Sequence, residues 1–268
     1  MSKTGLVMSV IQEKGGQGKS NSTLNIASYL AKDHPVLIID LDGQAADITY
    51  YLFGNFVGNS ADAMRSDILT IMDVLNGKAA IENVIQPVHQ NLDVIPANIE
   101  VTNMSSTNKI STFRKLISEL KNHYDYILID VPPTPNWSHV LCLSVCDYVI
   151  PIINPDPASP KAFISLNESV DEIRDTMNDK LEYLGVLVNK FDGRTNLSKT
   201  IIVEVAKIAA SIGTSLFDTK IHQSVSLSEQ TLFHKNIFDY APGSKAAKEY
   251  EALCKEILNR IQERKIEE

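Results

Sequence analysis

The sequence has 268 residues, 44% of them hydrophobic, which suffices to bury a full core as one large domain or two small ones. Its formal net charge of −8 argues against a generally basic nucleic-acid-binding protein, although a local basic patch is compatible with it. It contains no apolar run of about 18 residues, no signal-like N-terminus and no CxxC among its three cysteines, so we expect a soluble protein of the reducing cytosol.

Apolar runs and helical spacing alternate along the first half of the chain. Residues 6–11 predict a short buried strand, and residues 22–32 predict a helix because apolar side chains recur at helical spacing. Residues 34–42 form an apolar run ending in two aspartates, typical of a strand buried on both faces of a parallel sheet. After a loop with short helical pieces over 43–65, we expect a helix over 67–77 that Gly77 ends, a strand over 91–98, a helix over 111–123 and a strand over 124–133.

The second half continues the same alternation. Strands are expected over 148–154, over 183–191 and near 214–221, with helices between them and a long last helix over 244–263. This order predicts a doubly wound α/β fold, a mostly parallel sheet with helices on both faces. No linker rich in Pro, Gly or Ser divides the chain, so we expect a single domain over residues 1–268.

A glycine-rich stretch, VIQEKGGQGKSN over residues 10–21, stands between the first predicted strand and helix. A phosphate-binding loop is usually G-x-x-x-x-G-K-[ST], but here Glu13 occupies the place of the leading glycine. Lys19 is expected to bridge the β- and γ-phosphates, and the Ser20 hydroxyl to ligate Mg²⁺. The N-terminus of a helix favours phosphate binding. Gly15, Gly16 and Gly18 are expected to let the backbone come close to the phosphate oxygens, because glycine has no Cβ atom.

Acidic residues end two of the apolar strands. Asp40 and Asp42 close the run VLIIDLD, and Asp130 closes YDYILID. Ligands of open α/β sheets bind beyond the carboxyl ends of the strands, where carboxylates can hold a magnesium ion and its waters. The alternative is that these aspartates only cap the helices that follow.

Lys14 is a second lysine in the loop, which the ordinary pattern does not require. Since Lys19 already serves the phosphates, Lys14 must point elsewhere. It either reaches back to its own nucleotide or reaches across to that of a neighbouring subunit, and the residues alone leave both options open.

These stretches together carry a family resemblance. KGGQGKS resembles the deviant Walker A motif of the ParA/MinD superfamily of partition and positioning ATPases, and VLIIDLDGQ resembles that family's second acidic motif. NLDVIPANIE, YDYILIDVPPTPN, VLVNKFDGRTNLSK and the C-terminal region are similar to its later motifs in the right order. The likeness covers nearly the whole chain and is strongest to short, Soj-like ParA proteins, which lack an N-terminal helix-turn-helix extension.

The resemblance implies a P-loop ATPase that hydrolyses ATP weakly, with Mg²⁺, as a homodimer that sandwiches ATP at its interface. It assigns catalysis to Lys14, reaching the partner's nucleotide, to Lys19, and to Asp42, which positions the attacking water. It implies metal binding by Ser20 and, through waters, by Asp40 and Asp130, and adenine recognition by Asn189. The nucleotide-binding set is then Lys14, Gly15, Gly16, Gln17, Gly18, Lys19, Ser20, Asn21 and Asn189.

Three positions near the site depart from the family pattern. Gln17 replaces the usual valine, Asn21 the second threonine and Gly43 the proline of the second acidic motif. We expect Gln17 and Asn21 to add polar contacts to phosphate or to the partner subunit, and Gly43 to loosen its turn.

The positions that bind DNA in the family are only partly kept. Arg194 and Lys245 match basic positions of the ParA branch, whereas Gln223 and Ser226 stand where arginines are usual. Nonspecific DNA binding depends on several Lys or Arg contacts that release counterions. Other lysines either compensate or form an ordinary solvated face: Lys199, Lys207, Lys220, Lys235 and Lys248.

The favoured hypothesis is a cytoplasmic partition ATPase that binds nonspecific DNA on the nucleoid and segregates a plasmid or chromosome with a centromere-binding, ParB-type adaptor. The alternative is a ParA-like ATPase that positions a protein cargo without DNA. A third hypothesis is a metabolic or metal-carrier relative with the same loop. The acidic C-terminal tail argues against membrane targeting. We expect Cys142 and Cys146 to pack in the core, and the histidines show no zinc-ligand spacing.

Overall fold

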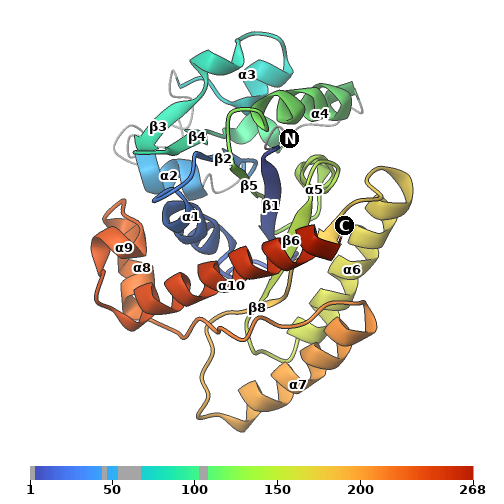
Figure 1. Ribbon diagram of the computed structural model, residues 1–268, viewed down its shortest axis with the longest axis vertical. Helices are drawn as coiled ribbons and strands as arrows, with labels where there is room; N and C mark the ends of the chain where they lie inside the picture. The colour runs from blue at the N-terminus through green and yellow to red at the C-terminus, as the bar shows by residue number, and fades with distance from the viewer. Residues whose placement is uncertain (1–3, 44–46, 54–67, 103–107, 268) are drawn as a thin grey trace.

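The computed structural model describes residues 4–43, 47–53, 68–102 and 108–267 (Figure 1). Within them, one sheet has the strand order β3-β4-β2-β5-β1-β6-β7, and β8 also pairs with β6. All pairs are parallel except β3 with β4. The strands are β1 (Leu6–Ile11), β2 (Val36–Asp40), β3 (Gln86–His89), β4 (Leu92–Ile95), β5 (Tyr126–Asp130), β6 (Tyr148–Ile153), β7 (Glu182–Tyr183) and β8 (Leu187–Val188).

Helices cover both faces of the sheet. The described α-helices are α1 (Lys19–Leu30), α2 (Asp47–Phe53), α3 (Ile71–Leu75), α4 (Asn108–Leu120), α5 (Trp137–Leu143), α6 (Ser159–Thr176), α7 (Asn196–Ser211), α8 (Val225–Leu232), α9 (Ile237–Tyr240) and α10 (Lys245–Glu267). One core contains side chains of α3 to α7, and the other contains side chains of α1, α9 and α10. In Figure 1 the strands run between these two sets. The predicted doubly wound α/β fold is confirmed.

The strand order places a crevice at the carboxyl edge beside β1. From β1 the chain crosses past β5 to β2 with α1 on one face, whereas from β5 it crosses past β1 to β6 with α5 on the other face. Where successive connections leave in opposite directions, the loops after the strands diverge and ligands bind between them. The glycine loop follows β1 and therefore lies at this crevice.

Most predicted elements appear with small shifts at their ends. The first helix begins at Lys19, three residues before the predicted Ser22, directly after Gly18, whose φ of 93° and ψ of 25° glycine adopts readily. The last helix extends beyond the predicted residue 263 to Glu267. Cys142 and Cys146 are both buried in the core that contains side chains of α3 to α7, as predicted.

Three expectations need correction. The helix predicted over 67–77 is reduced to α3, since Thr70 and Asp73 form a capping box that starts it late. The strand predicted over 183–191 is two short strands, which Gly185 separates where it packs against Phe217. Residues 214–221 contain a single isolated bridge, from Leu216 to Val186. The strand β3 was not predicted, because it is short and contains Pro87 and only one large apolar side chain, Val88. Of the loop with short helical pieces predicted over 43–65, residues 47–53 form one such piece, α2, as predicted, and residues 44–46 and 54–65 lie outside the described ranges.

Candidate phosphate-binding site

The glycine loop between β1 and α1 has the backbone freedom that a phosphate cradle requires. Gly16 and Gly18 have φ values of 71° and 93°, in the left-handed region that favours glycine. A Cβ atom on Gly18 would lie 2.5 Å from the Asn189 side-chain nitrogen, whereas one on Gly16 would meet nothing within 4 Å. Lys19 and Ser20, which follow at the start of α1, are both 6% exposed. The loop thus holds these two side chains at the base of the crevice.

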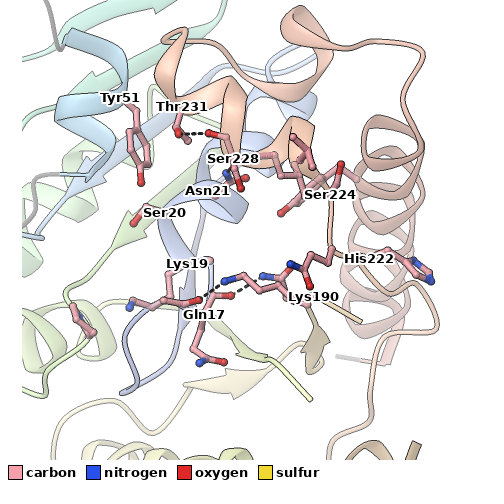
Figure 2. A pocket seen from close by; sticks show the side chains of 18 of the residues that line it. Gln17, Lys19, Ser20, Asn21, Tyr51, Lys190, His222, Ser224, Ser228 and Thr231 are labelled. Carbon is pink, nitrogen blue, oxygen red and sulfur yellow. Dashed lines mark hydrogen bonds between the residues drawn. The ribbon is translucent and has the colours of Figure 1, made fainter. Parts of the chain in front are cut away.

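The outer part of the loop is fixed by hydrogen bonds from β6 and β8. The Asn154 backbone N–H donates to Gln17 Oε1 at 2.9 Å, and Asn189 Nδ2 donates to the Gln17 carbonyl at 2.6 Å. Lys190 Nζ donates to the Gly16 carbonyl at 2.8 Å (Figure 2). Since the Gln17 side chain is 3% exposed and bonded to the end of β6, phosphate contact at this position is left to its backbone N–H.

Asn21 joins α1 to α8. Its side-chain nitrogen donates to the Leu227 carbonyl at 2.8 Å, and its side-chain oxygen accepts from Asn25 at 2.7 Å and from Gln230 at 3.1 Å. The expected extra polar contact at this position is therefore made within the chain. It sets where α8 lies relative to the loop.

The acidic strand ends meet below the loop. Asp40 and Asp130 are opposite one another in the β2–β5 ladder, and both are fully buried. Burial, with a smaller contribution from the charge of Asp42, raises the pKa of Asp40 to about 7 against the hydrogen bonds from Thr49 and Asp42. Burial and the charge of Asp40 raise the pKa of Asp130 well above its usual range, although Ser20 and Lys19 oppose the rise. The pair therefore favours holding a proton or a cation at neutral pH.

The two buried carboxylates differ in their partners. Asp40 accepts from the Asp42 backbone N–H at 2.9 Å and from the Thr49 backbone and hydroxyl at 3.0 and 2.7 Å, so it ties α2 to the end of β2. Neither oxygen of Asp130 has a partner of good hydrogen-bond geometry among the described residues, although Ser20 is near enough to lower its pKa. The Asp130 oxygens and the Ser20 hydroxyl are hard oxygen ligands of the kind that Mg²⁺ takes.

This donor set suits a magnesium ion that is bound mainly through phosphate and water. In the described part of the chain, no three His, Cys, Asp or Glu side chains converge as a complete protein site. Mg²⁺ typically keeps several waters and uses one or two protein ligands with substrate phosphates. The Ser20 hydroxyl would be a direct ligand here, and Asp130 would hold the waters.

A cavity of about 560 Å³ opens over the loop (Figure 2), within the range of sites that hold small molecules and cofactors. Residues from the loop, β8 and α8 form its walls: Gly16, Gln17, Gly18, Lys19, Ser20, Asn21, Asp42, Tyr51, Pro133, Asn189, Lys190, His222, Gln223, Ser224, Val225, Leu227, Ser228, Thr231 and Tyr250. Of the predicted site residues, Lys14, Gly15, Asp40 and Asp130 are not in this wall. Sequence reasoning missed Tyr51, Lys190 and the α8 segment, because no motif relates α8 to the loop.

Comparisons with known proteins now bear on this geometry. A family model described as an AAA domain matches residues 5–183, more than half of the chain. The chain belongs to the ParA/MinD family of ATPases. The chromosome-partitioning ATPase Soj of Treponema pallidum is 29% identical over 264 residues, which cover 96% of this chain and 98% of Soj.

Two solved structures show the same fold as this ParA/MinD chain. A putative plasmid partition protein of Borrelia burgdorferi bound to AMPPNP superposes with a TM-score of 0.77 at 23% identity, covering 97% of this chain and 99% of that one. An ATP complex of a Cyanothece McdA variant superposes with a TM-score of 0.80 at 18% identity, covering 97% of this chain and 98% of that one.

In this ParA/MinD chain, the second loop lysine, Lys14, forms an ion pair with a residue of the same chain. Lys14 Nζ donates to Asp156 Oδ1 at 2.7 Å, with the two side chains 38% and 32% exposed. Partial burial raises the pKa of Asp156, but the Lys14 ammonium and the Ala158 N–H outweigh it, so the pKa is lowered overall. Glu13, in place of the leading glycine, accepts hydrogen bonds from Ser165 and Ser169 of α6. Both contacts fix the entry of the loop to the α6 side.

The two basic positions expected to bind DNA lie outside the cavity and are paired with acids. Arg194 donates from Nε and Nη2 to the two oxygens of Asp192, both at 2.9 Å. Lys245 Nζ lies 3.5 Å from Glu249 Oε1. The expectation for Gly43 needs correction: a Cβ there would lie 2.7 Å from the Asn98 carbonyl, so this glycine allows close packing and does not loosen the turn.

Among the described residues, no helix combines the length and the apolar character needed to span a bilayer.

Proposed function

We propose that this chain is a weak Mg²⁺-dependent ATPase of the partition type, which binds ATP over the Gly15–Asn21 loop. The observation that carries the proposal is the convergence of Lys19 and Ser20 at the base of one cavity, with the Asp40–Asp130 pair buried beneath and Asp42 in its wall. Phosphoryl transfer needs mainly positioning and charge stabilisation, and this set provides both.

Each residue has a role that follows from its place. Lys19 and the N–H groups of the loop offset charge on the β- and γ-phosphates, and Mg²⁺ would add a Lewis acid held by Ser20 and, through waters, by Asp130 and Asp40. Asp42 is 2% exposed and lines the cavity, where it orients the attacking water. Asp40, which accepts from the Asp42 backbone, keeps Asp42 in position. Asn189, at the edge of the loop, faces the adenine.

Homodimerisation would complete the site. Lys14 supplies its charge to the partner's nucleotide, so that hydrolysis depends on assembly. Its bond to Asp156 within the subunit must open first. A partly exposed ion pair is worth little, so the approach of a polyphosphate is enough to displace it.

The track of this cytoplasmic ATPase is nonspecific DNA of the nucleoid, and a ParB-type adaptor bound to a centromere stimulates hydrolysis. Its cargo is a plasmid or a chromosome. Support comes from relatives described as a chromosome-partitioning ATPase and a plasmid partition protein. Arg194 and Lys245 supply phosphate contacts in this proposal.

A second candidate is an ATPase that positions a protein cargo without DNA. The observation that favours it is the pairing of Arg194 with Asp192 and of Lys245 with Glu249, which lowers the positive charge available to a phosphate backbone. Gln223 and Ser226 add no charge where the family usually has arginines.

The test uses the Asp42→Ala protein with ATP, and Lys14→Ala as the matched control. Asp42→Ala should accumulate as the ATP-bound dimer by light scattering, because ATP stays unhydrolysed, whereas Lys14→Ala should stay monomeric. Retention of DNA by the trapped dimer at low salt, and its release at raised salt, would support the DNA track. A dimer that ignores DNA would favour the protein cargo, and an absence of any ATP-dependent dimer would refute the assembly step.

A further inference from the structure

Lys190 is a third lysine at the phosphate loop, and no motif assigns it a role. It follows Asn189 at the end of β8, lines the cavity, and donates from Nζ to the Gly16 carbonyl at 2.8 Å. Figure 2 shows its side chain extending from the β8 end toward the loop, on the cavity side. Lys19 enters the same cavity from the start of α1, so two cations of one subunit approach it from different elements.

The backbone at Lys190 is held in an unusual conformation that turns this side chain toward the loop. Its φ of 49° lies in the left-handed region, where a residue other than Gly, Asn or Asp is uncommon. The flanking N–H groups fix it there, since Asn189 donates to Ile153 at 2.8 Å and Phe191 donates to Ile221 at 3.0 Å. Such strain persists where the surroundings determine it, and it clusters at functional sites.

Lys190 differs from three other basic residues discussed above in having no acidic partner. Lys14, Arg194 and Lys245 each pair with a carboxylate, whereas Lys190 forms no ion pair with any described residue. Its acceptor is a neutral carbonyl. A phosphate oxygen adds the attraction between two opposite charges to this charge-assisted hydrogen bond, whereas a carbonyl offers only a dipole, so a phosphate is the better acceptor for this cation.

We propose that Lys190 is a phosphate-binding residue, which exchanges the Gly16 carbonyl for a phosphate oxygen of the nucleotide in its own subunit. The ligand class is a nucleoside di- or triphosphate, and the inference rests on the proposed nucleotide site. Lys190 acts in cis, unlike Lys14, so its contribution does not require a dimer.

The experiment measures the Kd of MgADP for Lys190→Met, Lys190→Gln and Lys190→Arg by competition with a fluorescent ADP analogue. MgADP is chosen because it tests the cis contact without ATP-dependent assembly. Gln can still donate to Gly16 but carries no charge, whereas Arg keeps the charge. Lys115→Met, at an exposed position of α4, removes the same charge outside the cavity wall.

We expect Kd to rise about tenfold for Lys190→Met and Lys190→Gln, in line with the loss of one charged hydrogen bond. Lys190→Arg should stay within about threefold of the unmodified protein, and Lys115→Met should not change Kd. The loss in Lys190→Met should shrink at high salt.

An unchanged Kd in Lys190→Gln would overturn the proposal, since the bond to Gly16 would then be sufficient. A loss in Lys190→Arg equal to that in Lys190→Met would also overturn it. Thermal midpoints without nucleotide identify any variant that fails to fold, and Lys190→Arg then carries the test. If neither the unmodified protein nor the Lys19→Ala variant binds MgADP, the proposed nucleotide site itself is refuted. That outcome is distinct from a failure of the Lys190 proposal alone.

Discussion

The phosphate loop and the surface around Arg194 and Lys245 are built in opposite ways. In the loop, Lys19 and Ser20 are 6% exposed and are oriented by the backbone of β1 and α1. On the surface, the Arg194 side chain is 90% exposed and the Lys245 side chain 69%, and each contacts an acidic neighbour close in sequence. A preorganised, buried set does not have to be ordered when its ligand binds, whereas exposed side chains do.

This contrast separates two parts of the proposed function: nucleotide binding, which uses groups positioned by the fold, and partner choice, which uses exposed side chains. Desolvated charges around a shaped cavity interact strongly with a phosphate, so the proposed nucleotide chemistry depends on groups that the fold itself positions. Exposed, paired cations interact weakly and are screened by salt, so in the proposed function the choice between DNA and a protein partner depends on a few surface side chains. The four predictions below start at the loop and end at the surface.

Gly18→Ala and Gly16→Ala are a matched pair for the loop geometry. Both place a side chain at a positive φ, which costs about 1 kcal/mol or slightly more. Only Gly18→Ala also drives a Cβ to 2.5 Å from the Asn189 amide, so we expect it to lose about 3 kcal/mol of unfolding free energy in total. Urea denaturation without nucleotide measures both variants. Equal losses would show that Asn189 moves aside freely and that the loop is less rigid than described.

His139, near the base of the site, should make stability depend on pH. It is 5% exposed, and burial, with the charge of Lys19, lowers its pKa from 6.5 to about 4. Between pH 6.5 and 4 the unfolded chain binds a proton that the folded chain excludes, so this residue removes stability as the pH falls, by about 2 kcal/mol at pH 5.

The His139→Leu variant isolates this contribution. Its unfolding free energy relative to the unmodified protein should improve by about 2 kcal/mol between pH 7 and pH 5. Urea denaturation at the two pH values measures the difference, in which contributions from all other titrating groups cancel. A constant difference would mean that His139 is hydrated or paired in solution.

Asp156→Asn should make dimerisation easier, because the Lys14 ammonium loses its partner within the subunit. We expect the concentration of ATP at half-maximal dimer to fall about fivefold at most, since the pair is partly exposed. Light scattering in the Asp42→Ala background measures the change, with Asp179→Asn as an exposed acidic control. A rise in that concentration would show that Asp156 contacts the partner and does not restrain Lys14.

Asp192→Asn gives the smallest expected effect and tests the surface. Removing the carboxylate frees the Arg194 guanidinium, so the affinity of the trapped dimer for DNA should rise about twofold at low salt. Asp179→Asn removes an equal charge elsewhere and should have a smaller effect. Fluorescence anisotropy with a labelled duplex measures both. If neither variant changes the affinity for DNA, and Arg194→Ala binds DNA as tightly as the unmodified protein, the surface around Arg194 does not bind DNA.

Local patterns predicted the strands that are buried on both faces and the loop between 10 and 21, since continuous apolar runs and glycine spacing are signals within one segment. They did not predict β3, whose pairing with β4 depends on an edge that another segment provides. They also did not predict the contact from Lys14 to Asp156, because these positions are 142 residues apart and share no motif. The single domain over 1–268 and the roles of the site residues remain predictions.

Residue type and order along the chain were enough to predict the groups at the loop, because each belongs to one short segment. These groups are the glycines, Lys19, Ser20 and the acidic strand ends. Three other facts appear only in the folded chain: Asp40 and Asp130 stand side by side, α8 lines the cavity, and Lys190 donates to Gly16. Those facts depend on strand order and on packing between distant segments, which folding sets through the burial of many side chains at once.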